Sequence, residues 1–565
     1  MRNKWSRFTF LWCLSLLWGA CGSESIIAEK LTDYVQLNIG TAHSRWFFYT
    51  PAAVPFGMAK PAPSTNGHEG NKSGWEAVGY DSRHTSIEGF ANFHEFQIGG
   101  IVCAPTTGTL KTVPGALDSS NEGYRSAFDK KDEFATSGYY SVFLKDYGIK
   151  AELTATKRVA FHRYTYPANK EGHLIFDIGN QQGESGKVSD AKVKINADGS
   201  IEGWVTTLPE YVKKYQKGAS LSMYFYAVPD QSPVATGTFI GKVQQPDKKE
   251  VNGKGAGAYL TFAAGSEKKV VNIKIGLSYT SVANAKNNLQ KEAADLSFDK
   301  AKENALTTWE EHLGRIAVDK IKFYTGLYHA LLGRGLASDV NGAYPKNDGG
   351  IGQISLGENG QPIHHHYNTD AIWGAFWNLT QLWSIAYPEY LQDWVQSQLL
   401  IYKDAGWLGD GIAASRYVSG VGTNYISLVA AAAYNSGLRN FDVDLGYKAA
   451  LKNEIDWQNR PAGAGKVDLK AFLERGFIPF DESYNWLDFP DGSHFGTSHS
   501  LEYSFSSYAV AQWAKALGKK EDYAKLMQLS QNWKKSFDPE TQFIRPRRLR
   551  NSYLLYNMEV HYLIK

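Results

Sequence analysis

Two aspartates in the second half of the chain stand close to tryptophans and could do acid–base chemistry. Asp370 lies three residues before Trp373, and Asp410 lies three residues after Trp407. A carboxyl group can give a proton to a bound molecule or take one from it, and an indole face can stack on a sugar ring. Each aspartate could instead have a purely structural role. An aspartate after Thr369 fits a helix cap, and an aspartate between two glycines fits a tight turn.

Three consecutive histidines, His364 to His366, could suggest a metal site. Consecutive side chains point apart on any regular element, however, so three in a row do not converge on one ion. We therefore expect the triplet to form a loop at the rim of a cleft, and we assign no metal ligand in this chain.

The composition favours some partners and excludes others. The chain has 16 Trp and 33 Tyr residues, which suit contacts with sugar rings, although most of them must pack a large core. The formal net charge of +3 includes basic residues close to the N-terminus, so the rest of the chain is near neutral. Nothing in this charge indicates binding to nucleic acid or to an acidic partner.

The first twenty residues predict export. Three basic residues precede the apolar run from Phe8 to Trp18, and a small pair, Gly19-Ala20, stands directly before Cys21. This is the layout of a secretory signal peptide, and a cysteine right after the cleavage site resembles a bacterial lipobox. We expect residues 1–20 to be the signal and Cys21 to carry the lipid. The protein would then be a periplasmic or cell-surface lipoprotein of a Gram-negative bacterium, anchored in the outer membrane. A plain signal peptide with an incidental cysteine is the alternative.

The hydrophobic pattern of residues 30–282 predicts strands. Gly138 to Tyr166 alternates apolar and polar residues around Gly148, which is typical of a long hairpin. Many antiparallel strands separated by turns favour a β-sandwich. Further strands are expected at His173–Ile178, Leu221–Ala227, Tyr259–Phe262 and Val270–Tyr279.

The period becomes helical near Val282. We expect a linker helix at residues 283–317 and a helical domain at residues 318–565, so the fold class is a β-sandwich followed by paired helices. The expected helices of this domain are Ile321–Leu336, Ala371–Ile385, Pro388–Asp404, Tyr425–Ser436, Val443–Trp457, Leu501–Leu517 and Glu521–Phe537.

Several strings, taken together and in order, resemble glycoside hydrolase family 92. They are NIGT at Asn38–Thr41, PFGM at Pro55–Met58, GYD at Gly79–Asp81, IEGFANFH at Ile87–His94, FYTGLYHALL at Phe323–Leu332, SLEYSFSSYAVAQWAKALGKKEDY at Ser500–Tyr523 and SFDPETQFIRPR at Ser536–Arg547. The resemblance implies a β-sandwich packed on an (α/α)₆ barrel with the active site at their junction. It further implies a calcium-dependent exo-α-mannosidase that inverts the anomeric centre of mannose-containing glycans, including N-glycans. Inversion needs two carboxyl groups about 6.5 to 9.5 Å apart.

The resemblance also assigns candidate substrate contacts. In relatives, the sandwich strings that hold Trp75, Asp81 and His94 approach the sugar, and a buried core role is the alternative for His94. On the helical side of the cleft, Trp373, Trp377 and Trp407 could hold a glycan by stacking.

This sequence departs from the family where catalysis is expected. The family's W-D-T-F string reads Trp373-Gly374-Ala375-Phe376 here, and Asp370 could replace the missing carboxylate. No glutamate stands near Val418, the expected position of the general acid, which leaves Asp410 as the nearest candidate. The string of the general base, and most calcium ligands, would follow the last matching string, so we expect an incomplete barrel.

Two hypotheses therefore remain. The chain is a glycoside hydrolase of the α-mannosidase type, or it is a sugar-binding surface lipoprotein that keeps the aromatic cleft with impaired or no turnover. A decayed gene product, whose helical domain does not fold, is a third possibility.

Overall fold

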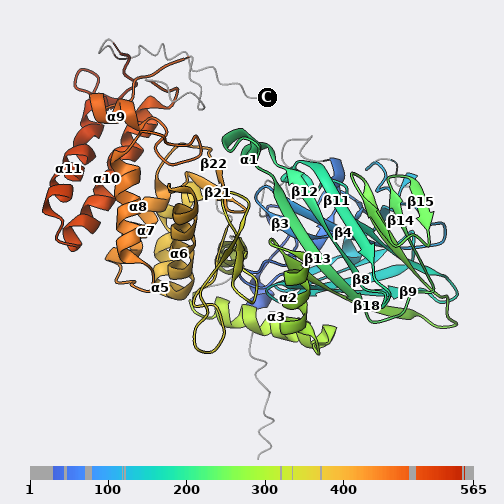
Figure 1. Cartoon of the computed structure of the whole chain (residues 1–565). Helices are drawn as coiled ribbons and strands as arrows, with labels where there is room; N and C mark the ends of the chain where they lie inside the picture. The colour runs from blue at the N-terminus through green and yellow to red at the C-terminus, as the bar shows by residue number, and fades with distance from the viewer. Residues whose placement is uncertain are drawn as a thin grey trace, which may run out of the picture.

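Strands occupy the chain from residue 62 to residue 278, and helices dominate the part that follows (Figure 1). The computed structural model describes residues 30–42, 48–69, 79–117, 119, 122–318, 321–333, 335–368, 372–482, 492–549 and 553. The sandwich followed by helices that the sequence predicts is confirmed.

Two antiparallel sheets form the first domain. The first sheet has the order β1 (Ala62–Ser64), β3 (Gly89–Glu95), β4 (Ile98–Thr107), β10 (Gly172–Asp177), β17 (Ala256–Phe262), β14 (Ala235–Ile240) and β15 (Val243–Pro246). The second sheet has the order β16 (Glu250–Asn252), β11 (Lys187–Ile195), β12 (Ile201–Leu208), β13 (Leu221–Pro229), β18 (Lys269–Ser278), β9 (Val159–Tyr166), β8 (Ile149–Ala155), β7 (Tyr139–Leu144) and β6 (Phe134–Thr136).

The inner faces of the two sheets share one apolar core. The Phe176 ring of β10 stacks on the Phe225 ring of β13 with centroids 5.9 Å apart. Buried and half-buried residues alternate along β12, as expected for a strand with one face in the core. The segment predicted as one hairpin forms the three strands β7, β8 and β9, because the chain turns a second time at Thr156 to Arg158.

Two helices, and not one, connect the domains. They are α2 (Val282–Ala293) and α3 (Phe298–Leu313). The Ser297 hydroxyl accepts a hydrogen bond from the Lys300 N–H and so begins a new helix. Gly276 lets α2 lie close to β18, because a Cβ there would stand 2.2 Å from the Ala285 carbonyl oxygen.

The helical domain has helices wherever the sequence predicts them, but two predicted helices are divided. Its helices are α4 (Ile321–Leu332), η6 (Ile372–Trp377), α5 (Leu379–Ala386), α6 (Pro388–Ala405), α7 (Tyr425–Asn435), α8 (Val443–Ile455), α9 (Leu469–Arg475), α10 (Gly496–Ala516) and α11 (Lys520–Ser530). The helix predicted at Ala371–Ile385 is the 3₁₀ helix η6 followed by α5, and the helix predicted at Glu521–Phe537 is α11 followed by the 3₁₀ helix η7 (Gln531–Ser536). Helix α9 was not predicted. Trp513 of α10 packs against the rings of Tyr434, Phe441 and Tyr447, which joins the helices α7, α8 and α10. None of the helices in the described part of the chain combines the length and the apolar character that a membrane crossing requires.

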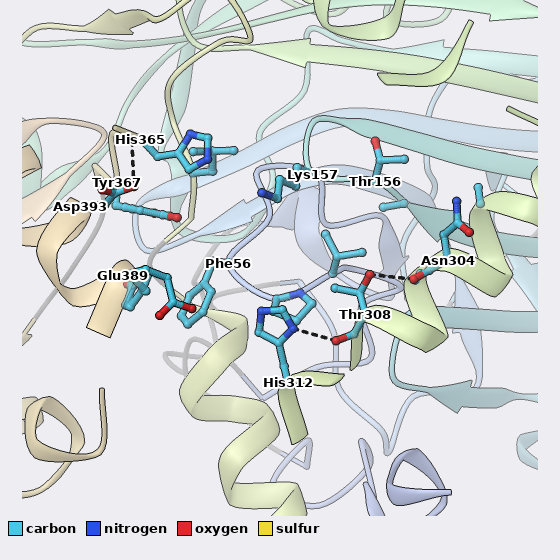
Figure 2. A pocket seen from close by; sticks show the side chains of 17 residues that line it. Phe56, Thr156, Lys157, Asn304, Thr308, His312, His365, Tyr367, Glu389 and Asp393 are labelled. Atoms are coloured by element: carbon cyan, nitrogen blue, oxygen red, sulfur yellow. Dashed lines mark hydrogen bonds between the residues drawn. The ribbon is translucent and has the colours of Figure 1, made fainter. Parts of the chain in front are cut away.

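The two domains meet through loops and through several helices (Figure 1), among them α4, whose Tyr328 hydroxyl donates to the Pro51 carbonyl oxygen, and α6, whose Tyr390 ring stacks on Phe56. Helix α1 (Glu210–Tyr215) reaches from the sandwich toward the hairpin of β21 (Gly411–Ala413) and β22 (Arg416–Val418). The Gln216 side chain donates to the Asn347 carbonyl oxygen at 2.8 Å and accepts from the Tyr417 N–H at 3.1 Å. On another side of the junction, the sandwich, α3 and α6 enclose a cavity (Figure 2).

Candidate functional site

The tip of the β3–β4 hairpin carries the sandwich into the junction. The Phe96 ring at this tip lies 6.1 Å from the Trp373 ring and 5.9 Å from the Tyr211 ring, measured between centroids. Gln97 accepts a hydrogen bond of 3.0 Å from the Tyr211 N–H. Phe96 of the sandwich thus meets Tyr211 of α1 and Trp373 of η6 in one aromatic cluster.

Trp373 is held by the loop that contains Asp410. Its indole N–H donates a hydrogen bond of 3.1 Å to the Asp410 carbonyl oxygen. A Cβ on Gly420 would stand 2.4 Å from the indole, so the ring occupies the space that a side chain there would fill. The structure therefore brings together Trp373 and Asp410, two of the residues predicted for the site.

The Asp410 carboxylate organises its own loop. The side chain is fully buried and accepts six hydrogen bonds of 2.8 to 3.2 Å. The donors are the hydroxyls of Ser419 and Thr423 and the N–H groups of Gly420, Val421, Gly422 and Thr423. These six donors occupy the positions around the carboxylate oxygens that a bound water or sugar hydroxyl would need. This environment argues against the predicted role of Asp410 as a general acid and fits its alternative reading as a turn residue.

The other predicted contacts lie in interior positions. The His94 ring is buried in the sandwich, where Nδ1 lies 3.0 Å from the Lys60 carbonyl oxygen. Asp81 is buried and pairs with Arg83. Trp407 is 5% exposed, and Lys452 and Arg460 lie over its ring at 4.1 and 4.5 Å, which leaves little of the indole for a sugar. Trp75, Asp370 and Cys21 lie outside the described residues.

A histidine that the sequence analysis did not single out braces the Asp410 loop. The Nδ1 of His499 lies 2.5 Å from an Asp468 carboxylate oxygen, and its Nε2 lies 2.7 Å from the Val421 carbonyl oxygen. Both ring nitrogens of His499 therefore contact oxygen atoms that hold the loop in place. Val421 in turn donates its N–H to Asp410.

Glu502 is a carboxyl group that the sequence analysis also missed, although it lies in the SLEYS string. It stands one turn after His499 on α10. Burial raises the pKa of Glu502, and a hydrogen bond from Tyr425 opposes this shift. The Tyr425 ring stacks on Phe376 of η6 with centroids 4.3 Å apart, so Glu502 belongs to the same junction as Trp373.

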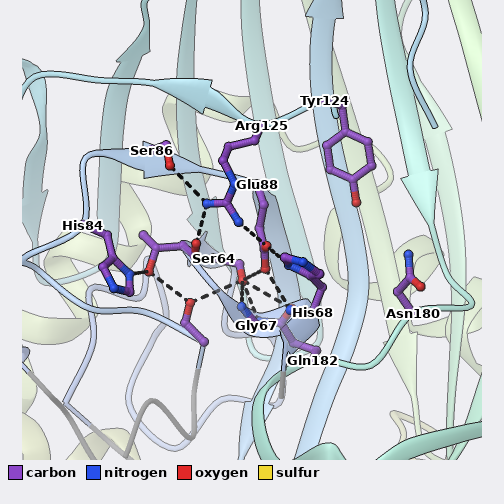
Figure 3. Close-up of polar contacts among 12 residues, drawn as sticks. Ser64, Gly67, His68, His84, Ser86, Glu88, Tyr124, Arg125, Asn180 and Gln182 are labelled. Carbon is purple, nitrogen blue, oxygen red and sulfur yellow. Dashed lines mark hydrogen bonds and ion pairs between the residues drawn. The ribbon is translucent and has the colours of Figure 1, made fainter. Parts of the chain in front are cut away.

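A buried polar cluster supports the sandwich segment that leads to Trp75 (Figure 3). Glu88 contacts His68 and Arg125, and it accepts a hydrogen bond of 2.7 Å from Ser64. Burial alone would raise the pKa of Glu88, but the contact with His68 and the charge of Arg125 lower it to about 2. The same contact raises the pKa of His68 against the opposing effect of burial. This ion cluster fixes the chain just before the predicted Trp75 string.

Calcium is implied by the resemblance, and the described residues form no cluster of acidic side chains for it. Within the ranges given above, no group of three or more His, Cys, Asp or Glu side chains could hold a metal ion. The Asp410 carboxylate, which lies in the loop-rich part of the junction, is already surrounded by N–H and O–H donors. Calcium requires several free oxygen ligands, and these donors exclude a cation from that carboxylate.

Comparison with known proteins gives consistent matches. The family model described as the glycosyl hydrolase family 92 N-terminal domain matches residues 34–278, and the model of the family's catalytic domain matches residues 284–561. A protein of Arthroderma benhamiae described as an uncharacterized secreted glycosidase is 25% identical over 96% of this chain. The chain spans 66% of that relative's length.

Two solved structures show the same architecture. A family 92 α-mannosidase of Bacteroides thetaiotaomicron matches with a TM-score of 0.81 and 25% identity, covering 93% of this chain and 68% of that one. An inverting mannosidase of the same family from Bacteroides thetaiotaomicron VPI-5482 matches with a TM-score of 0.79 and 21% identity, with the same coverage. The second likeness supports the fold alone.

Proposed function

Because this chain belongs to glycosyl hydrolase family 92, we propose that it is a glycoside hydrolase of the α-mannosidase type, which acts on mannose-containing glycans with inversion. The observation that carries this proposal is the likeness to a family α-mannosidase over 93% of the chain. A mannosidase of the same family and similar fold has been solved with mannoimidazole bound. The half-buried rings of Tyr211 and Trp373 supply apolar surface at the junction where the sugar would lie, and the buried Phe96 ring packs against both.

The proposal needs a proton donor, and Glu502 is our candidate among the described carboxyl groups of the junction. An acid that is protonated near neutral pH needs a raised pKa, and burial shifts Glu502 in that direction. Its contact with Tyr425 connects it to η6 through Phe376. Asp370 remains a proposed catalytic residue, as a replacement for the carboxylate that the family carries after the tryptophan.

Export is part of the proposal. The Arthroderma relative is a secreted protein by its description, and the signal layout before Cys21 agrees with a route out of the cytoplasm. A lipid on Cys21 stays a prediction, which metabolic labelling with a fatty acid tests.

Sugar binding without turnover is the second candidate. Two observations favour it. The Asp410 carboxylate is already occupied by hydrogen bonds from its own loop, and Gly374 stands in place of an acidic residue between Trp373 and Phe376. The aromatic cluster would then retain a glycan that no described acid–base pair cleaves.

Proton NMR of α-mannobiose incubated with the protein separates the two functions. Hydrolysis by inversion releases β-mannose first, and we expect that anomer in the presence of added calcium. Calorimetry of the same sugar runs beside it. Heat of binding without any released mannose would favour the binding protein, and neither heat nor release would contradict both.

A further inference from the structure

A cavity of 480 Å³ lies where the sandwich, α3 and α6 meet (Figure 2). Pockets that hold small molecules measure about 300 to 1,000 Å³, so this volume suits a compact ligand. Its polar walls come from three places: the β8–β9 turn with Lys157, helix α3 with His312, and the start of α6 with Asp393. No residue predicted for the mannoside site lines it.

Lys157 and Asp393 place opposite charges on facing walls without forming an ion pair. The two side chains point toward one another in Figure 2. The Asp393 carboxylate accepts a hydrogen bond of 3.0 Å from the His365 N–H, and no contact of the Lys157 ammonium group is found within the described part of the chain. Desolvation lowers the pKa of Lys157 and raises the pKa of Asp393. A ligand between them could therefore take a hydrogen bond from one and give a hydrogen bond to the other.

Two neutral imidazoles add further donors and acceptors. His312 Nδ1 lies 2.8 Å from the Thr308 carbonyl oxygen, so Nδ1 carries the proton and Nε2 is left as an acceptor. The buried Nδ1 of His365 has no hydrogen-bond partner among the described residues. Burial lowers the pKa of His312 and lowers that of His365 to about 3, so both rings are uncharged at neutral pH.

An aromatic wall completes the cavity. The Phe56 ring stacks on Tyr390 with centroids 3.7 Å apart, and Tyr367 meets Tyr390 edge-on at 4.7 Å. Phe56 has a φ of +55°, a left-handed conformation that costs energy in a residue with a bulky side chain. Its N–H donates to the Leu331 carbonyl oxygen and its carbonyl oxygen accepts from Leu336, so the backbone holds the ring in place at this cost.

We propose that this cavity is a second ligand site, which takes one neutral sugar unit. A hydroxyl group both donates and accepts, so neighbouring hydroxyls can bridge Lys157, Asp393 and the neutral imidazoles. The apolar face of the ring would lie against Phe56. An anion would be attracted by Lys157 but repelled by Asp393 and by Glu389 beside it, so the cavity suits an uncharged ligand better.

The second site is separate from the mannoside junction. Asp393 lies in the second turn of α6, and the Asp410 loop follows the other end of this helix of 18 residues. At 1.5 Å per residue, the helix extends about 18 Å from Asp393 to its end at Ala405. The proposal therefore does not require the chain to hydrolyse mannosides.

Hydrogen–deuterium exchange with methyl α-mannoside tests the proposal directly. We expect slower exchange at residues 155–158 and 388–393 of the full chain at saturating sugar. Slower exchange at residues 410–424 would instead indicate sugar binding at the mannoside junction. The two proposed sites can therefore be refuted independently. No change at residues 155–158 and 388–393 would overturn the second site, and so would protection there by inorganic phosphate but not by the sugar.

Two variants identify the groups that bind. Lys157→Gln and Asp393→Asn should each weaken the protection of residues 388–393 at least about tenfold in sugar concentration, because each removes a charged hydrogen-bond partner. Lys150→Gln is the matched control, since Lys150 is an exposed lysine of β8 that does not line the cavity. Equal sugar dependence in all three variants would contradict the proposal. If a variant unfolds, as thermal unfolding would show, the wild-type exchange pattern still decides.

Discussion

The indole N–H of Trp373 donates a hydrogen bond to the Asp410 carbonyl oxygen, across 37 positions of sequence. The contact fastens η6 to the loop before β21, and the Phe96 ring of the sandwich packs against the same indole. Trp373 is thus the residue through which both domains define the proposed glycan cleft.

Two glycine substitutions test how the Trp373 indole packs against its neighbours. Gly420→Ala puts a methyl group 2.4 Å from the indole, so we expect a loss of about 1 to 3 kcal/mol in the free energy of unfolding. Gly374→Ala is the matched control, because its Cβ would meet nothing within 4 Å. It should change stability by less than about 1 kcal/mol. Urea unfolding measures both, and equal stability of the two variants would refute this packing.

Asp410→Asn should lower the stability of the folded protein, and not only its activity. The amide nitrogen of Asn would face N–H and O–H donors, so we expect a loss of about 3 kcal/mol or more in urea unfolding. Asp444→Asn, at an exposed position of α8, serves as the control. An Asp410→Asn protein of wild-type stability that no longer released mannose would restore the catalytic role that the loop geometry argues against.

Asp177 should make stability fall as the pH rises. Burial raises its pKa from 3.8 to about 6, against the hydrogen bonds from Tyr124 and Asn180. The folded state therefore favours the protonated form. The stabilisation is complete below about pH 4 and is lost as the pH rises through about 6, with a total of about 3 kcal/mol. Asp177→Asn cannot titrate, so the stability of the wild type relative to this variant should decline from pH 4 to pH 7. A constant difference over that range would contradict the burial of the charge.

Glu502→Gln tests the proposed proton donor. Gln can keep the contact with Tyr425 but cannot give a proton, so mannose release should fall about 10² to 10⁴-fold while the melting temperature stays close to that of the wild type. Glu521→Gln, at an exposed position of α11, should be fully active. Undiminished release by Glu502→Gln would assign the proton donor to another residue.

Much of the fold could be predicted from local patterns. The change from alternating to helical hydrophobic spacing near Val282 separates the domains, because each period reports which face of an element is buried. Two element boundaries could not be predicted in this way. The turn at Thr156 to Arg158 lacks the Gly, Pro or Asn that marks a turn. Ser297 was predicted to lie inside one helix, but its hydroxyl caps the start of the second helix, α3.

Residues of the site could be predicted only where a short sequence motif contains them. Trp373 could be predicted because its string keeps both aromatic residues, and Asp410 because it is the nearest carboxylate to the expected position of the general acid. That the Asp410 carboxylate is satisfied by residues 419–423 depends on how the loop folds back, which no spacing reveals. Lys157 and Asp393 face one cavity from positions 236 residues apart, and neither stands in a recognisable site motif.

Calorimetric titration of α-mannobiose into wild type, Gly420→Ala and Gly374→Ala decides whether the mannoside cleft is built on Trp373. We expect the wild type and Gly374→Ala to bind with similar affinity, whereas Gly420→Ala, which displaces the indole, should bind at least about tenfold more weakly. Equal affinity of all three folded proteins, or no binding by the wild type, would contradict it.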